Sequence, residues 1–345
     1  MRVLVTGHNG YIGTVLVPML WERGHEVVGL DTNYFESCLF TGALPEVETI
    51  EKDIRDVEAA DVAGFDAVIH LAGLSNDPLG DYKPNLTEDI NEAAAVKLAR
   101  LAKAAGVQRF LFASSCSNYG AGGADFLDEN AAFNPVTPYG VSKVKVEVAL
   151  EQLADADFSP TYLRASTAYG LSPLIRFDLV INNLTAWALT TGLVYLKSDG
   201  TPWRPVVHVA DIALAYVAAL HAPREAIHNE AFNVGTTTEN YQIRELAEIV
   251  RDIVPNCRID FAPDAGPDTR CYRVDCNKIA RVLHEFKPQW TARRGVEQLY
   301  ESYRKVGLTL EEFEGERYKR IAHVKRLVDE GRLDHELRWR RPAAG

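Results

Sequence analysis

Continuous apolar runs alternate with amphipathic stretches over the first two-thirds of the chain. The amphipathic stretches include IGTVLVPMLWERG near the N-terminus and EDINEAAAVKLARLAKAAG further along. The apolar runs span residues 2–7, 26–31, 66–73, 109–115, 160–166 and 230–235. Continuous apolar strands joined by helices indicate a parallel sheet that helices cover on both faces. The pattern therefore predicts an α/β fold with a doubly wound parallel sheet.

The pattern becomes less regular beyond the fifth apolar run, where turns, short helices and several arginines follow one another. We expect two separated segments, 172–204 and 236–310, to form a smaller substrate-binding lobe. The sheet domain would then comprise residues 1–171 and 205–235. Residues 311–345 are charged and rich in helix formers, so they predict an appended helical extension at the surface.

Composition and charge narrow the class of protein. Of the 345 residues, 47% are hydrophobic and 25% are charged, which is ordinary for a globular protein. The net charge of −11 argues against a general nucleic-acid binder, because phosphate contacts need clustered Lys and Arg. No signal peptide is visible, and no apolar run reaches the ~20 residues of a membrane span. We therefore expect a cytoplasmic protein with neither nucleic acid nor membrane as a partner.

The cysteines also favour a reducing compartment. There are five of them, widely spaced and without a CxxC pair, which does not suit a disulfide framework. Cys271 and Cys276 lie close together in the sequence, but no second pair of ligands accompanies them. We therefore predict no metal site.

A glycine-rich turn, VTGHNGYIG, links the first strand to the first helix. Its glycines, Gly7, Gly10 and Gly13, let the backbone approach a diphosphate, and the helix N-terminus offers N–H groups to it. Asp31 ends the second strand, where a carboxylate binds ribose hydroxyls and repels the extra phosphate of NADP. The pattern favours NAD as the cofactor. The alternative is a turn followed by a strand-capping aspartate.

The segment PYGVSK places Tyr139 and Lys143 four residues apart, on one face of a helix. An ammonium group near a phenol stabilises the phenolate and lowers a pKa that is ordinarily near 10. Such a tyrosine can remove a hydroxyl proton while hydride passes to a dinucleotide. Ser115, at the end of the preceding strand FLFASS, completes the predicted catalytic group. The alternative is an ordinary surface pair.

With these motifs in view, the sequence resembles the extended short-chain dehydrogenase/reductase family, in its nucleotide-sugar epimerase/dehydratase branch. The resemblance covers about residues 1–305, and it includes DIRD, VIHLAG, FASSCSNYG, LRASTAYG, GTPWRPVVHVADIA and DTRCYRVD. It implies a Rossmann-type fold, catalysis by Ser115, Tyr139 and Lys143, and a homodimer formed through helices beginning near Glu88 and Tyr139. The implied NAD-binding residues are Gly7, Gly10, Tyr11, Ile12, Gly13, Asp31, Asp53, Ile54, Leu71, Ala72, Gly73, Leu74, Asn91, Tyr139, Lys143 and Ser166.

The resemblance also implies a site for a nucleoside-diphosphate sugar. Arg204 and Arg270 match two arginines that clamp the diphosphate, a task that suits the guanidinium fork. Surface ion pairs are the alternative, with Asp199 or Asp211 for Arg204 and with Asp268 for Arg270. The implied substrate-binding residues are Ser75, Asn76, Cys116, Ser117, Thr167, Asn183, Leu184, Arg204 and Arg270. Thr167 stands where many relatives place an asparagine, and Ser75 with Asn76 either contacts the sugar or forms a turn.

The two positions after Ser115 favour one reaction within the branch. In the family's 4,6-dehydratases these positions resemble an Asp–Glu pair, whereas the 4-epimerases have small residues there. Cys116 and Ser117 fit the epimerase pattern, so we expect an NAD-dependent nucleotide-sugar 4-epimerase. Cys116 is either a small packed side chain, a substrate contact or an acid/base. The alternatives are a 4,6-dehydratase, a 4-dehydrogenase and, in another class, a non-catalytic NAD-binding sensor or scaffold.

Overall fold

A computed structural model describes residues 1–75, 83–266 and 271–340. The strands are β1 (Arg2–Thr6), β2 (Glu26–Asp31), β3 (Glu48–Glu51), β4 (Ala67–His70), β5 (Arg109–Ser115), β6 (Ala121–Leu127), β7 (Ser159–Ala165), β8 (Thr167–Tyr169), β9 (Leu193–Ser198), β10 (Trp203–His208), β11 (Glu230–Val234), β12 (Asn240–Gln242), β13 (Arg258–Gly266) and β14 (Cys271–Val274). The α-helices are α1 (Gly13–Glu22), α3 (Pro84–Thr87), α4 (Ala94–Ala104), α5 (Pro138–Glu151), α6 (Val180–Thr191), α7 (Val209–His221), α8 (Arg224–Ile227), α9 (Ile243–Ile253), α10 (Asn277–Val282), α11 (Ala292–Val306), α12 (Leu310–Glu314) and α13 (Arg320–Asp329). Shorter turns are the 3₁₀ helices η1 (Glu36–Cys38), η2 (Ile54–Asp56), η3 (Ala59–Val62) and η5 (Cys116–Tyr119), and the π-helix η4 (Glu88–Ala93).

Seven strands form the central sheet, in the order β11-β7-β5-β4-β1-β2-β3. Every neighbouring pair in this sheet is parallel. The order reverses direction between β1 and β4, as in a doubly wound sheet, so the carboxyl ends of both halves open on the same edge. The six apolar runs of the sequence correspond to six of these strands, and the predicted fold class is confirmed.

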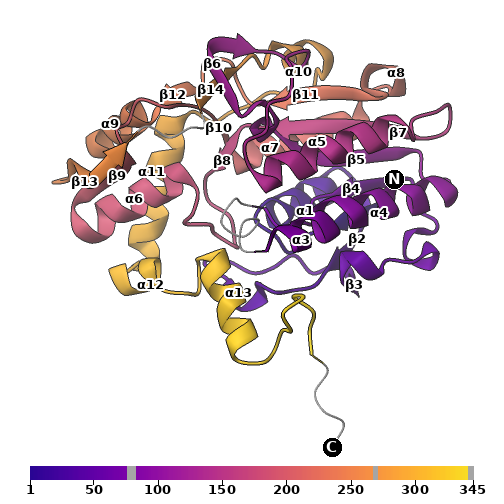
Figure 1. The fold of residues 1–345 in the computed structure, drawn as a ribbon, viewed down its shortest axis with the longest axis horizontal. Coiled ribbons are helices and arrows are strands. Elements are labelled where there is room, and N and C mark those ends of the chain that lie inside the picture. Colours follow the sequence, from indigo (N-terminus) through magenta and orange to yellow (C-terminus); the bar gives the residue numbers. More distant parts are fainter. Residues whose placement is uncertain (76–82, 267–270, 341–345) are drawn as a thin grey trace, which may run out of the picture.

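Helices cover both faces of the sheet, as the continuous apolar strands require. Helices α1 and α7 pack together on one face, while α4 and α5 pack together on the other (Figure 1). Strand side chains such as Val3 and Val5 are wholly buried under the first pair, and Val68 and Phe110 under the second. Burying both faces of a parallel sheet in this way supplies most of the hydrophobic driving force for the fold.

A second group of elements lies beside the sheet (Figure 1). Helices α6, α9 and α11 pack on one another and on β9, around an apolar core of their own. Helix α12 still packs on α6 of this group, and the chain then forms α13, which the same figure shows in yellow near the N-terminal segments. Among the described helices, none is long and apolar enough to cross a membrane.

Candidate active site

The glycine turn and the ends of four strands enclose a hollow at the carboxyl edge of the sheet. Gly7 has a φ of 74°, and a Cβ on it would lie 2.7 Å from the nitrogen of Ala72. A Cβ on Gly13 would lie 2.4 Å from the carbonyl oxygen of His8. Only glycine lets the turn pass this close to its neighbours, and the N-terminus of α1 then faces the hollow, where it can bind a diphosphate. The predicted cofactor residues on this wall are Gly7, Gly10, Tyr11, Ile12, Gly13, Asp31, Asp53, Ile54, Leu71, Ala72, Gly73 and Leu74.

Asp31 is held at the rim of this hollow by main-chain N–H groups. Asn9 donates to one carboxylate oxygen over 3.1 Å, and Asn33 donates to the other over 2.9 Å. Burial of the carboxyl group raises the pKa of Asp31 above its ordinary value. The fixed position suits an acceptor for ribose hydroxyls, as the sequence predicts.

Asn91 does not reach the wall of the hollow. Its amide group donates to the carbonyl oxygen of Leu74 over 3.0 Å, and its Oδ1 accepts the N–H of Leu74 over 2.7 Å. The side chain is therefore used in clamping the backbone of the loop after β4. The predicted cofactor contact of Asn91 stays a prediction, and the contact that the structure shows is with Leu74, which lines the hollow.

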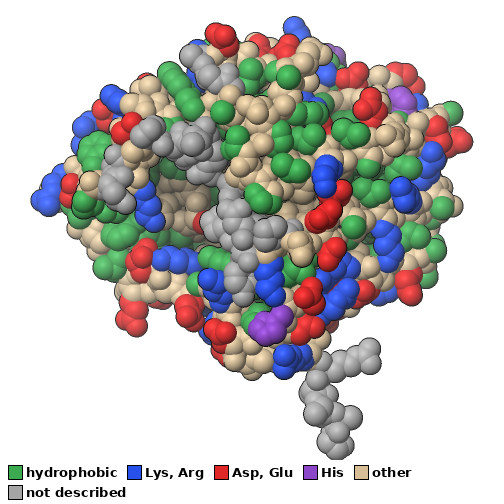
Figure 2. Space-filling model, in the orientation of Figure 1, with side chains coloured by type: hydrophobic (Ala, Val, Ile, Leu, Met, Phe, Trp, Pro, Cys, Tyr) green, Lys and Arg blue, Asp and Glu red, His purple; other side chains and the backbone are tan. Residues whose placement is uncertain are grey.

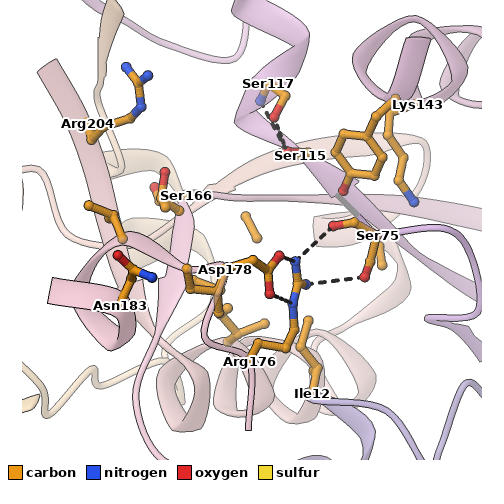
Figure 3. A pocket seen from close by; sticks show the side chains of 18 of the residues that line it. Ile12, Ser75, Ser115, Ser117, Lys143, Ser166, Arg176, Asp178, Asn183 and Arg204 are labelled. Carbon is orange, nitrogen blue, oxygen red and sulfur yellow. Dashed lines mark hydrogen bonds and ion pairs between the residues drawn. The ribbon is translucent and has the colours of Figure 1, made fainter. Parts of the chain in front are cut away.

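The three predicted catalytic residues lie on one wall of a larger cavity of about 920 Å³. Ser115 is delivered by the end of β5. Helix α5 begins directly after Thr137, whose hydroxyl accepts the N–H of Gly140 over 3.1 Å, as an N-cap should. This cap places Tyr139 and Lys143 on consecutive turns of the helix, where both line the cavity. Figure 3 shows Lys143 on this wall.

Lys143 is almost wholly enclosed, with 6% of its surface exposed. Its Nζ lies 4.7 Å from the ring centroid of Phe112 and 5.5 Å from that of Tyr139. Burial lowers the pKa of Lys143 to about 8, although the carboxylate of Glu147 opposes this change. At neutral pH the group is still mainly an ammonium, and its charge lies next to the phenol that it is expected to activate.

A buried polar network holds the three elements that bear these residues. Glu147, one turn beyond Lys143, pairs with Arg164 of β7 over 2.6 Å. The same carboxylate accepts hydrogen bonds from the Ser114 hydroxyl and, over 3.1 Å, from the Asn118 amide. The network therefore ties α5 to β5, η5 and β7 directly behind the catalytic wall. A buried charge pair with its hydrogen bonds satisfied fixes geometry more than it adds stability.

Cys116 points away from the cavity, and the expected substrate contact is corrected here. Its side chain is 0% exposed, and its thiol donates to the carbonyl oxygen of Arg164 over 3.1 Å. Burial raises the pKa of Cys116 to about 12, which disfavours the thiolate near neutral pH. Alternation along the chain sends Ser115 and Ser117 to the cavity instead, and the Ser115 hydroxyl donates to that of Ser117 over 2.9 Å.

The other predicted substrate residues that the structure describes surround the same cavity: Ser75, Ser117, Thr167, Asn183, Leu184 and Arg204, together with Ser166. The Ser166 hydroxyl is buried and lies near the thiols of Cys116 and Cys276. Arg204 donates to the carbonyl oxygen of Trp203 over 2.8 Å. Asn76 and Arg270 lie outside the described residues.

Sequence reasoning missed an ion pair on the cavity wall, between the buried Arg176 and the partly exposed side chain of Asp178. Arg176 and Asp178 form two hydrogen bonds of 2.6 and 3.1 Å, and Arg176 also donates to the hydroxyl of Ser75 over 3.2 Å (Figure 3). Asp178 is the one acidic residue among the described residues that line the cavity. The alternation RFD in a region without regular pattern was the available signal. Tyr195, Lys197 and Tyr272 also line the cavity and were not predicted.

The molecule is hollowed between its two groups of elements, where this cavity opens (Figure 2). Two segments from opposite sides of the hollow contribute to its wall: the end of β5 with α5, and the start of α6 with β9 and β10. A site of this size, with a few convergent polar groups next to a dinucleotide hollow, suits a second extended ligand.

Several known proteins are similar to this chain in sequence and in fold. UDP-glucose 4-epimerase from Homo sapiens is 33% identical, over 87% of this chain and 94% of its own. The solved structure of MoeE5 in complex with UDP-glucuronic acid and NAD has a TM-score of 0.76 at 28% identity, covering 88% of this chain and 99% of that one. The structure of TunA, an NAD-dependent NDP-hexosamine 5,6-dehydratase, has a TM-score of 0.78 at 23% identity, with coverages of 88% and 98%, and so supports the fold alone. A sequence profile matches residues 3–235. By that match the chain belongs to the NAD dependent epimerase/dehydratase family.

Proposed function

We propose that the protein is a nucleotide-sugar 4-epimerase that works through a transient 4-keto sugar. The observation that supports this reaction over elimination of water is the chemistry of the wall around Ser115. The following two positions hold a buried thiol and a serine hydroxyl, and Asp178 is already bonded to Arg176. Elimination needs a general acid and a general base beside the sugar. The described residues of the wall offer no second carboxylate for that step.

In this proposal each catalytic side chain has a separate role. Tyr139 removes the proton of the sugar's C4 hydroxyl, and the Lys143 ammonium stabilises the resulting phenolate. The Ser115 hydroxyl, which donates to Ser117 in the structure, would turn its proton to the same sugar oxygen and accept the Ser117 hydroxyl proton in exchange. The hollow lined by Gly7, Gly13 and Asp31 would hold NAD, which would supply a reversible hydride acceptor at C4, so the reaction would involve no net oxidation. The cavity has room for the sugar to turn between the two transfers.

We assign the nucleoside diphosphate to the side of the cavity formed by α6, β9 and β10. Asn183 and Leu184 lie on α6, and Arg204 lies on β10, where its guanidinium can bind phosphate oxygens. This proposal divides the chain into an NAD-binding domain, residues 1–171 with 205–235, and a substrate lobe, residues 172–204 with 236–310. Two of the proteins named above, UDP-glucose 4-epimerase and MoeE5, act on or bind UDP-sugars, which makes UDP-sugars the first candidates to test.

The test is to incubate the purified protein with NAD and a panel of nucleotide sugars in heavy water. Products are read by mass spectrometry and NMR, and Tyr139→Phe is the matched control. We expect a stereoisomer of unchanged mass, without deuterium on carbon, formed by the wild type and about 100-fold or more slowly by the variant. A product lighter by one water would show a dehydratase, and net formation of NADH would show a 4-dehydrogenase. Ligand binding without turnover in either protein would favour a sensor or scaffold.

A further inference from the structure

The C-terminal segment, residues 317–340, packs against the loop that follows β2. The hydroxyl of Tyr34 donates to the carbonyl oxygen of Leu337. The indole N–H of Trp339 donates to the carbonyl oxygen of Thr32 over 2.6 Å, and its ring lies 5.7 Å from that of Tyr34. This loop directly follows the carboxylate that is expected to bind the adenosine ribose. The segment therefore covers the adenosine end of the dinucleotide hollow.

The same segment also holds the loop that follows β3. Arg55 donates to the carbonyl oxygen of Glu336 over 2.8 Å, and Arg338 pairs with Asp56. Asp53, which lines the hollow, lies 3.9 Å from the Arg338 guanidinium. Two loops that are distant from the C-terminus in sequence are thus joined by one stretch of chain. Side chains of α13 complete the enclosure, because Val324 lines the hollow from this side.

Arg320, at the start of α13, extends into the hollow itself. It is 6% exposed, and its guanidinium carbon lies 3.9 Å from the ring centroid of Phe35. It donates to the carbonyl oxygen of Leu174 over 3.2 Å. Among the described residues, no carboxylate lies within ion-pair distance of it, whereas the neighbouring Arg176 is fully paired with Asp178. Arg320 is therefore a buried cation whose direct contacts are one neutral acceptor and an aromatic ring, while the charges of Asp31, Asp178 and Arg176 act on it from beyond ion-pair distance.

The buried guanidinium of Arg320 destabilises the cofactor-free protein. Burying a charge without a partner is strongly unfavourable, because water no longer solvates it. Burial, together with the charge of Arg176, lowers the pKa of Arg320 to about 10. The guanidinium remains charged at neutral pH, so its position stays unfavourable until an anion arrives. A fork of N–H donors in this setting is suited to phosphate oxygens.

The position of Arg320 identifies which anion it meets. The hollow runs from Asp31, on the adenosine side, to Arg176, which lines both the hollow and the catalytic cavity. The charges of both residues act on Arg320. The part of NAD that joins adenosine to the nicotinamide riboside is its diphosphate. We propose that Arg320 binds the diphosphate of NAD from the side opposite the glycine turn, and that the C-terminal segment thereby retains the cofactor.

The test measures binding, so it does not depend on which sugar the enzyme converts. Cofactor-free wild type, Arg320→Met and Arg326→Met are titrated with NAD, ADP and adenosine by calorimetry, with NMR for weak binding. Arg326 is the matched control, because it lies on the same helix but outside the hollow. We expect Arg320→Met to weaken the binding of NAD and of ADP by about 10- to 100-fold, and the binding of adenosine by less than about twofold. Arg326→Met should change the affinity for NAD, ADP or adenosine by no more than about twofold.

Thermal melting gives a second, independent readout. Removing an unpaired buried charge should raise the melting temperature of the cofactor-free protein, while the further rise on adding NAD becomes smaller. Unchanged affinity of Arg320→Met for NAD would overturn the proposal. Equal losses of affinity for ADP and for adenosine would also overturn it, since they would indicate that the Arg320 side chain acts by packing rather than by binding phosphate. A variant that does not fold, or that melts below the wild type without cofactor, would contradict the claim that the charge is unfavourable there.

Discussion

At the scale of single residues, Lys143 combines a catalytic charge with a cost in stability. Burial holds the pKa of this ammonium at about 8, below its ordinary 10.5. Below pH 8 the group is charged in both the folded and the unfolded chain, and the folded chain bears the full cost of burying it. Between pH 8 and 10.5 Lys143 loses its proton in the folded chain but keeps it in the unfolded chain. Because the unfolded chain then binds more protons, the free energy of unfolding increases as the pH rises.

The substitution Lys143→Met tests both the proposed role of this charge in turnover and its effect on stability. We expect turnover to fall by about 100-fold or more, since the phenolate loses its neighbouring cation. We expect the free energy of unfolding of the cofactor-free variant to exceed that of the wild type by about 1–3 kcal/mol at pH 7. Urea unfolding at pH 7, 8.5 and 10 should show the difference shrinking as pH rises. A difference that grows with pH would contradict the assignment of Lys143 as a charge that is buried at a cost.

Cys116 provides the opposite case, a residue next to the proposed catalytic serine that we predict to take no part in the reaction. Its thiol is enclosed and bonded to the carbonyl oxygen of Arg164, so Cys116→Ala should leave kcat within about threefold. The loss of a buried sulfur should lower the free energy of unfolding by about 1–2 kcal/mol. Ser117→Ala, which changes the neighbouring hydroxyl on the cavity wall, should reduce kcat/KM instead. A loss of more than tenfold in kcat on Cys116→Ala would return the thiol to the mechanism.

At the scale of elements, the position of α5 depends on the ion pair between Glu147 and Arg164. Both side chains are almost fully buried, at 5% and 6% of their side-chain surface. Glu147→Gln leaves the arginine uncompensated, and we expect it to cost about 3 kcal/mol of unfolding free energy. Denaturant unfolding checks this value. Glu151→Gln on the same helix is the control, since Glu151 is exposed and should change stability by less than about 0.5 kcal/mol.

The elements also show what could be predicted from sequence. The runs 2–7 and 109–115 correspond to β1 and β5, because apolar strands of a parallel sheet are continuous. Strand β3 was not predicted, since its sequence ETIE is short, polar and at the sheet edge. The proposed catalytic pair Tyr139 and Lys143 could be named from sequence because the two residues lie four positions apart on one helix. Arg320 was not, because its place in the hollow depends on chain packing across nearly 300 residues.

At the scale of the whole molecule, the helices η4, α4 and α5 form an outer layer over the sheet. The Lys145 ammonium pairs with Glu92 over 2.9 Å, which holds α5 beside η4. On α5, two valines face outward, Val141 with 39% and Val148 with 46% of their surface exposed. A pair of adjacent helices with apolar side chains on the outer face suits a two-fold interface between copies, in which each helix pair meets the same pair of its partner. The family resemblance implies a homodimer through these helices.

This leads to a prediction about assembly. The wild type should be a dimer at micromolar concentration, and Val148→Glu should make it a monomer, because a charge would then be buried at the centre of the interface. Light scattering coupled to gel filtration measures the mass of each. Val306→Glu is the control: this valine is equally exposed, at 45%, but lies at the end of α11 in the other lobe. If both variants remain dimeric, the interface lies on another face. If only the Val306 variant dissociates, α11 rather than α5 forms the contact.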